Sequence, residues 1–175
     1  MTVLYFECKQ YLIGKLKQAG IKTRIYTSEK QLEKCSESHV GAVLFERESD
    51  ARNGSKKRFR DQEGALHKRR RIFDRDITFS VVIGDYSDDA AETIFERFLA
   101  SLDAGLYVDG NFTEIEVESS DWVDINDSVL RAKVAVQTVI TFHGGLYRDT
   151  GYAPMRRIAV NEIERIMRKD SVNGK

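Results

Sequence analysis

Proline and cysteine are scarce in this sequence, and each scarcity excludes a class of protein. The 175 residues include one proline and 12 glycines, so no Pro-rich or Gly-rich linker divides the chain. The two cysteines, Cys8 and Cys35, lack metal-ligand spacing, and we expect free thiols of a reducing compartment. No apolar run approaches the roughly 18 residues of a membrane span. The N-terminal segment also lacks the pattern of a signal peptide, so we expect a cytoplasmic protein.

Motifs of catalysis and of cofactor binding are missing too. The sequence contains no Walker loop and no GxGxxG, GxSxG or HExxH pattern. A lone histidine at a strand end, such as His143, is structural far more often than catalytic. Asp85, Asp88 and Asp89 lack the spacing of a calcium loop, and acids in the first turn of a helix already complement its dipole. We therefore expect no enzymatic activity, no catalytic residue, no bound metal and no cofactor.

Charge is abundant but unevenly distributed along the chain. The 28 basic and 28 acidic residues give a formal net charge of zero. Residues 1–75 carry a balance of +8, residues 76–154 a balance of −11, and residues 155–175 a balance of +3. Such segregation bears on association rather than on fold. The opposite regions either neutralise each other within one folded chain or pair between molecules, and the sequence leaves both alternatives open.

Much of the positive charge lies in the stretch "SKKRFRDQEGALHKRRRIFDR", residues 55–75, which holds nine bases and three acids. Clustered Lys and Arg can bind phosphates. The neutral net charge and the lack of a nucleic-acid recognition motif favour a charged arm instead, and a solvated hairpin stays possible. We predict a projecting β-hairpin arm over residues 50–71, with the candidate contact residues Lys56, Lys57, Arg58, Arg60, Lys68, Arg69, Arg70 and Arg71.

Apolar periodicity predicts an α+β fold with a mainly antiparallel sheet and two helices packed on one of its faces. The predicted helices are 3–19 and 88–103, with a helical turn in 28–38 and a C-terminal helix at 155–169. The predicted strands alternate in polarity and cover 21–27, 40–48, 71–85, 112–119 and 128–145. We expect a single α+β domain over residues 1–150 and a helical extension over residues 151–175.

The strand-to-helix stretch "DITFSVVIGDYSDDAAETIFERFLASL" and the final strand "VAVQTVITFHGGLY" carry a resemblance, together with the order of the elements. Over residues 1–147 the chain resembles the tail terminator and tail-to-head joining proteins of long-tailed bacteriophages and phage-tail-like particles. The resemblance implies a structural protein that forms a ring, hexameric in that family. Such a ring caps the head-proximal end of the tail tube, ends tube and sheath polymerisation, and joins the tail to the neck.

Several partners and one location follow from the resemblance. The chain would bind other copies of itself, the tube protein, the sheath protein of a contractile tail, and neck or connector proteins. It would assemble in the host cytoplasm and stay in the virion or tail-like particle, with DNA only in transit through the lumen. The arm would contact a neighbour, the tube or the sheath, and the candidates for an acidic lumen or partner face are Glu114, Glu116 and Glu118.

Two other functions stay open beside this one. The basic residues 55–71 would also suit a nucleic-acid-binding protein, whose affinity for duplex DNA would depend steeply on salt. The chain could equally be a different neck or head-completion component.

Overall fold

The computed structural model describes residues 3–124 and 134–152, which form three helices and seven strands. The elements follow the chain as α1 (Leu4–Ala19), β1 (Ile25–Tyr26), α2 (Glu29–Leu32), β2 (Val40–Arg52), β3 (Lys56–Arg60), β4 (Leu66–Asp85), α3 (Asp88–Ser101), β5 (Gly105–Val108), β6 (Asn111–Asp124) and β7 (Val134–Gly151). The helix predicted at 155–169 lies outside the described residues. No helix in these two ranges has the length and apolar character that a membrane crossing requires.

The seven strands belong to one sheet in the order β1-β2-β4-β7-β6-β5, with β3 added beside β4. All pairs are antiparallel except β1 with β2, which run parallel. The prediction of a mainly antiparallel α+β fold is therefore confirmed in outline. Strand β5 was not predicted, because its four residues form a short strand at the sheet edge that shows no clear alternation.

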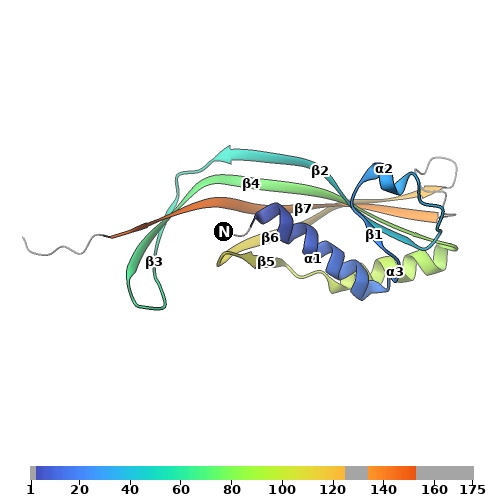
Figure 1. Ribbon diagram of the computed structural model, residues 1–175, viewed down its shortest axis with the longest axis horizontal. Coiled ribbons are helices and arrows are strands. Elements are labelled where there is room, and N and C mark those ends of the chain that lie inside the picture. Colours follow the sequence, from blue (N-terminus) through green and yellow to red (C-terminus); the bar gives the residue numbers. More distant parts are fainter. Residues whose placement is uncertain (1–2, 125–133, 153–175) are drawn as a thin grey trace, which may run out of the picture.

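Helices α1 and α3 cover one face of this sheet (Figure 1). In α1 the buried residues recur every three or four positions, which is the spacing of one helix face. Helix α3 begins at the predicted cap, where the Ser87 hydroxyl accepts a hydrogen bond of 3.3 Å from the Ala90 N–H. Side chains of both helices share one apolar cluster with Phe79 of β4 and Phe142 of β7, and both rings are fully buried.

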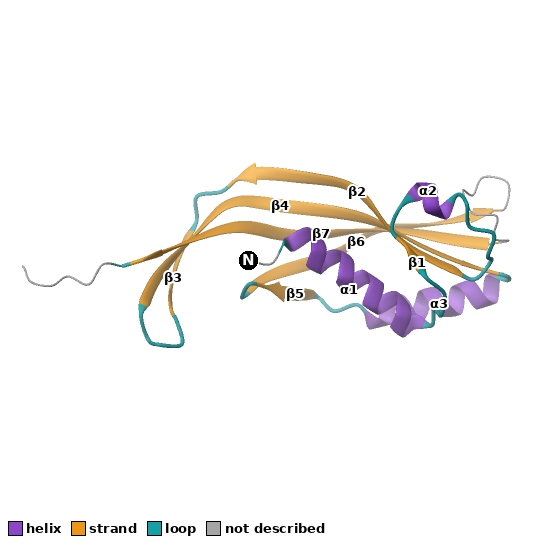
Figure 2. Ribbon diagram, viewed as in Figure 1, coloured by secondary structure: helices purple, strands orange, loops and turns teal. Residues whose placement is uncertain are grey.

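Helix α2 lies on the opposite side of the sheet from α1 and α3 (Figure 2). A smaller apolar cluster lies under it. Leu32 and Cys35 pack there against Val40, Val82 and other small side chains. Cys35 and Cys8 are both buried free thiols, and burial raises the pKa of Cys8 to about 12. The Cys8 thiol is therefore not in the ionised form that cysteine chemistry requires at neutral pH.

Strands β4 and β7 extend well beyond the two clusters into a region without helices (Figure 2). We call residues 50–75 and 144–151 the arm, and the remaining described residues the body. The predicted arm was a two-stranded hairpin, but the structure adds the end of β7 as a third strand, paired with β4 from His67↔Gly151 onward. The sequence did not reveal this extension, because the arm part of β7 contains three glycines and polar residues rather than apolar alternation.

Candidate assembly interface

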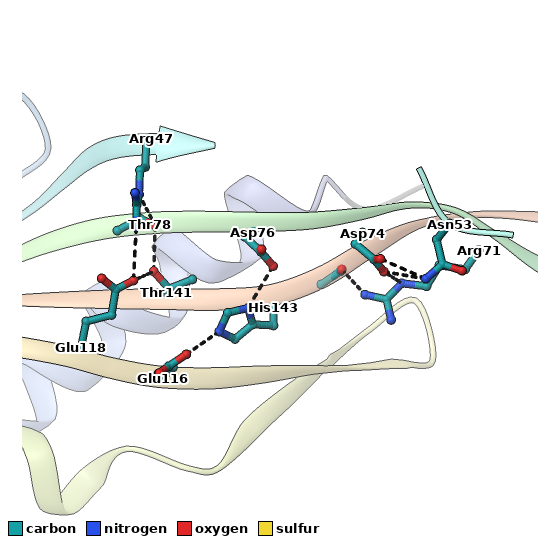
Figure 3. Close-up of polar contacts among 11 residues, drawn as sticks. Arg47, Asn53, Arg71, Asp74, Asp76, Thr78, Glu116, Glu118, Thr141 and His143 are labelled. Carbon is teal, nitrogen blue, oxygen red and sulfur yellow. Dashed lines mark hydrogen bonds and ion pairs between the residues drawn. The ribbon is translucent and has the colours of Figure 1, made fainter. Parts of the chain in front are cut away.

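The arm starts at a loop that is fixed by one asparagine. Asn53 accepts a hydrogen bond of 2.8 Å from the Ser55 N–H, and its side-chain amide donates to both carboxylate oxygens of Asp74 at 2.9 and 3.0 Å (Figure 3). The first contact is an Asx-type turn, which sets the direction of the next residues without helix or sheet bonds. Asn53 therefore directs β3 back alongside β4.

A second turn closes the hairpin at residues 61–65. The Asp61 carboxylate accepts hydrogen bonds from two backbone N–H groups of this turn, and its other oxygen lies 2.7 Å from Nε2 of His67. The contact with His67 lowers the pKa of Asp61 below its ordinary value. Gly64 adopts a φ of 82°, a region that side chains disfavour. These contacts give the tip of the arm a defined conformation.

Basic side chains line one face of the arm in two cross-strand rows. Arg70 of β4 is directly opposite Lys56 of β3 on one side and Arg148 of β7 on the other. Lys68 is directly opposite Arg58 in the next row. Directly opposed residues of neighbouring strands point to the same side of a sheet. We call these residues the basic face: Lys56, Arg58, Lys68, Arg70 and Arg148.

The basic face has no acid of its own within the described ranges. None of its five side chains forms an ion pair with residues 3–124 or 134–152. A hollow of about 670 Å³ lies between its bases and the loop at Gly54, lined in part by Arg52, Lys68, Arg70 and Arg148. Like charges directly opposite each other destabilise a sheet. An anionic partner would relieve this repulsion.

On the other face of the arm, Arg69 and Arg71 are paired with acids of the same chain. The Arg69 guanidinium makes two hydrogen bonds to the Asp149 carboxylate, of 2.7 and 2.6 Å, and lies 4.8 Å from the centre of the Phe59 ring. This pairing lowers the pKa of Asp149 below its ordinary value. Arg71 contacts the Asp74 carboxylate at 2.6 Å. We call this side, with Arg69, Arg71 and Asp149, the paired face.

The predicted contact residues therefore do not form one surface. Lys56, Arg58, Lys68 and Arg70 lie together on the basic face, whereas Arg69 and Arg71 lie on the paired face with Lys57. Arg60 lies near the tip and donates a hydrogen bond of 2.9 Å to the Gly64 carbonyl. Sequence reasoning missed Arg148 because it follows the predicted end of its strand, yet the register places it beside Arg70.

The predicted acidic residues lie on β6, on the sheet face turned away from α1 and α3. Glu116 contacts Nε2 of His143 at 2.8 Å, and Nδ1 of the same ring lies 2.9 Å from Asp76 (Figure 3). Glu118 accepts a hydrogen bond from Thr141 and lies 3.6 Å from the Arg47 guanidinium. Glu114 is exposed and is directly opposite His143. We call Glu114, Glu116 and Glu118 the acidic strip.

His143 has a structural place between two carboxylates. Partial burial alone would lower its pKa, but the hydrogen bonds to Asp76 and Glu116 outweigh this effect and raise the pKa above its ordinary value. The glycines that follow also have packing reasons, because a Cβ on Gly144 would lie 2.5 Å from a methyl group of Leu4. Within the described ranges, no group of three or more His, Cys, Asp or Glu side chains is arranged so that it could hold a metal ion.

Comparisons with known proteins show a likeness of fold to a solved structure and no match by sequence. No protein-family model matches the sequence, and no curated protein matches it. Among solved structures, the chain is similar to the sheath/tube terminator of an extracellular contractile injection system in its extended state, with a TM-score of 0.56 and 13% identity. The similarity covers 99% of this chain and 66% of that one, so the chain spans about two thirds of its neighbour's length. The two proteins share a fold.

Proposed function

We propose that this chain is a structural protein that terminates a phage-type tail, with no enzymatic activity and no cofactor. The similarity of fold to a sheath/tube terminator, over 99% of the chain, is the observation that carries the proposal. In this role the chain forms a ring of identical subunits, six in our proposal, on the head-proximal end of the tail tube. The ring ends tube and sheath polymerisation and presents a surface to the neck.

The arm suits such a role because it extends beyond the body. A closed ring is built from heterologous contacts, so each subunit needs two different and complementary surfaces. The basic face supplies one of them, and the excess of acids in residues 76–154 supplies the other. Complementary charge speeds and orients such an association. The tube protein, the sheath protein and neck proteins are the further partners, and the subunits assemble in the host cytoplasm before they enter the particle.

The acidic strip is our candidate for the surface that faces the lumen or a partner. Glu114, Glu116 and Glu118 share one sheet face, and Glu114 is exposed there. Carboxylates repel phosphates, so a lumen lined by this strip would let DNA pass without holding it. Within the ring, DNA is therefore in transit only.

Electron microscopy of the purified protein tests the proposal directly. The expected images show a ring with a central hole and six-fold symmetry. Added to polymerising tube protein, the chain should shorten the tubes and appear at one end only. A chain that stays monomeric at all concentrations and leaves tube length unchanged would overturn the proposed function.

The unpaired basic face supports one second candidate, binding to nucleic acid. Its five bases would contact phosphates and release counterions, so affinity for duplex DNA would fall steeply with salt. Fluorescence anisotropy with a labelled duplex, at a low and a physiological salt concentration, tests this candidate. Absence of binding at low salt removes it.

A further inference from the structure

The end of the body that lies farthest from the arm carries a small acidic and aromatic hollow, which local sequence patterns do not reveal. It has a volume of about 360 Å³ and is lined by Asp88 and Glu92 of α3, Trp122 and Val123 of β6, and Val134 of β7. We call it the acidic hollow. Trp122 is 48% exposed, and its ring is held edge-on by Phe95 at 6.1 Å between centroids. The contact with Phe95 thus orients the indole, and about half of the side chain stays open to solvent.

The chemistry of this hollow matches an arginine side chain. Asp88 and Glu92 are exposed and form no ion pair with any described residue. The helix dipole explains acids in the first turn of α3, but it does not explain an exposed tryptophan beside them. A guanidinium stacks on an aromatic face and forms paired hydrogen bonds with carboxylates, so it would use both features together.

The bases of the basic face cannot reach this hollow from within the same molecule. The arm and the beginning of α3 lie at opposite ends of the molecule (Figure 1). Val136, the register partner of Trp122, also pairs with Ile83, which is thirteen positions after Arg70 on the same strand. At about 3.3 Å per residue this separation is roughly 40 Å, far beyond the length of a side chain. The basic face and the acidic hollow therefore cannot neutralise each other within one molecule.

We propose that the basic face of one subunit docks on the acidic hollow of a second copy of this chain. Arg70 and Arg148 are the contact residues of the arm, and one guanidinium stacks on Trp122 between Asp88 and Glu92. The contact joins two different patches, so it is heterologous and repeats from subunit to subunit, as a closed ring requires. The inference rests on the self-association in the proposed function and names the surfaces that carry it.

A charge-swap experiment tests the contact. We expect R70E/R148E and D88K/E92K each to weaken self-association by roughly tenfold or more in sedimentation velocity. Mixing the two variants should restore association in part, because the reversed arm of one then matches the reversed hollow of the other. Trp122 is the sole tryptophan of the chain, so its emission should shift to shorter wavelength when the native protein associates and stay unshifted in either variant alone.

Matched controls separate this contact from a general effect of charge. Lys57 is an exposed base of the paired face, and Asp89 is an exposed acid of α3 outside the hollow lining. K57E and D89K should therefore leave association within about twofold of the native protein. Thermal unfolding by circular dichroism confirms that every variant is folded before its association is compared.

The outcomes distinguish this inference from the proposed function. Rings that form normally in both reversed variants would overturn the docking contact and leave the tail-terminator function standing. A native chain that neither associates nor changes tube length would overturn both. Loss of duplex-DNA binding in R70E/R148E with unchanged self-association would assign the basic face to nucleic acid and overturn the docking contact.

Discussion

The body and the arm are built on the same two strands, β4 and β7, yet different interactions hold them together. In the body these strands bury aromatic and aliphatic side chains under α1 and α3. In the arm no side chain is fully buried, and the strands are held by their backbone ladder and by surface ion pairs. Burial of apolar surface is the dominant favourable term in folding, so the body supplies most of the stability and the arm is ordered by continuity with it.

This difference explains how the arm can carry so many bases. A buried core constrains every side chain that faces it, whereas a ladder of backbone hydrogen bonds constrains the side chains only weakly. One arm face uses that freedom for internal ion pairs, and the other leaves its charges for a partner. Under the proposed function, contacts outside the chain shape the arm sequence more than its own stability does.

The largest expected effect comes from the same substitution made in both regions. Phe79→Ala in the body should cost about 3–5 kcal/mol of unfolding free energy, because it leaves a cavity among buried rings. Phe59→Ala in the arm should cost about 0.5–1 kcal/mol, the value of an exposed cation–π contact, here with Arg69. Chemical denaturation of both variants gives the two values, and equal losses would contradict the division into body and arm.

The division also shows what the sequence could reveal. Period-two alternation in residues 71–85 and the capped pattern after Ser87 are local signals of burial, so β4 and α3 were predicted near their observed places. The arm part of β7 lacks that signal, because its polar residues bury nothing and its pairing with β4 depends on a partner strand far away in the sequence. Local periodicity cannot report such pairing.

The sequence predicted which basic residues belong to the arm, but not on which face of the arm each of them lies. Adjacent bases such as Arg69 and Arg70 look equivalent in the sequence, yet successive side chains of a strand point to opposite faces of the sheet. Only Arg69 then meets an acid, Asp149, eighty positions later. The acidic hollow was missed for a similar reason, since Trp122 and Asp88 come together only where α3 packs against β6.

The second prediction concerns the paired face, where a substitution removes one acid. Asp149→Asn should weaken the pairing with Arg69 and cost about 0.2–1 kcal/mol, the range of partly exposed ion pairs. The loss should be local, so amide hydrogen exchange should speed up at β7 residues 147–151 and stay unchanged in the body. The matched control is Asp121→Asn. Asp121 is an exposed acid of the body that forms no ion pair with any described residue. Faster exchange throughout the body would contradict a local role.

The free energy of unfolding should depend on pH through His143, which lies at the junction between body and arm. Its folded-state pKa is raised by Asp76 and Glu116, while the unfolded value is about 6.5. The added stability is therefore complete below about pH 6.5 and is lost as pH rises through the folded-state pKa. His143→Gln removes this contribution, so the stability difference between native protein and variant should be larger at pH 5.5 than at pH 9. A difference that grows with pH would contradict the assignment.

The smallest expected effect has the opposite sign and concerns the basic face. Arg70→Ser removes the central charge of the row formed by Lys56, Arg70 and Arg148. Directly opposed like charges destabilise a sheet, so the isolated subunit should become more stable by a few tenths of a kcal/mol. Because salt screens such repulsion, the gain in stability should shrink between about 0.05 and 0.5 M NaCl.

The matched control is Lys57→Ser, which removes a base of similar exposure from the paired face. Lys57 lies opposite Arg69, and Asp149 already balances the charge of Arg69, so the gain in stability should be smaller. Denaturation midpoints at both salt concentrations measure the effect, and a loss of stability in Arg70→Ser would mean that the arginine serves the fold. A gain would mean that the arm keeps its basic face at a cost to its own stability, as expected of a surface that serves a partner.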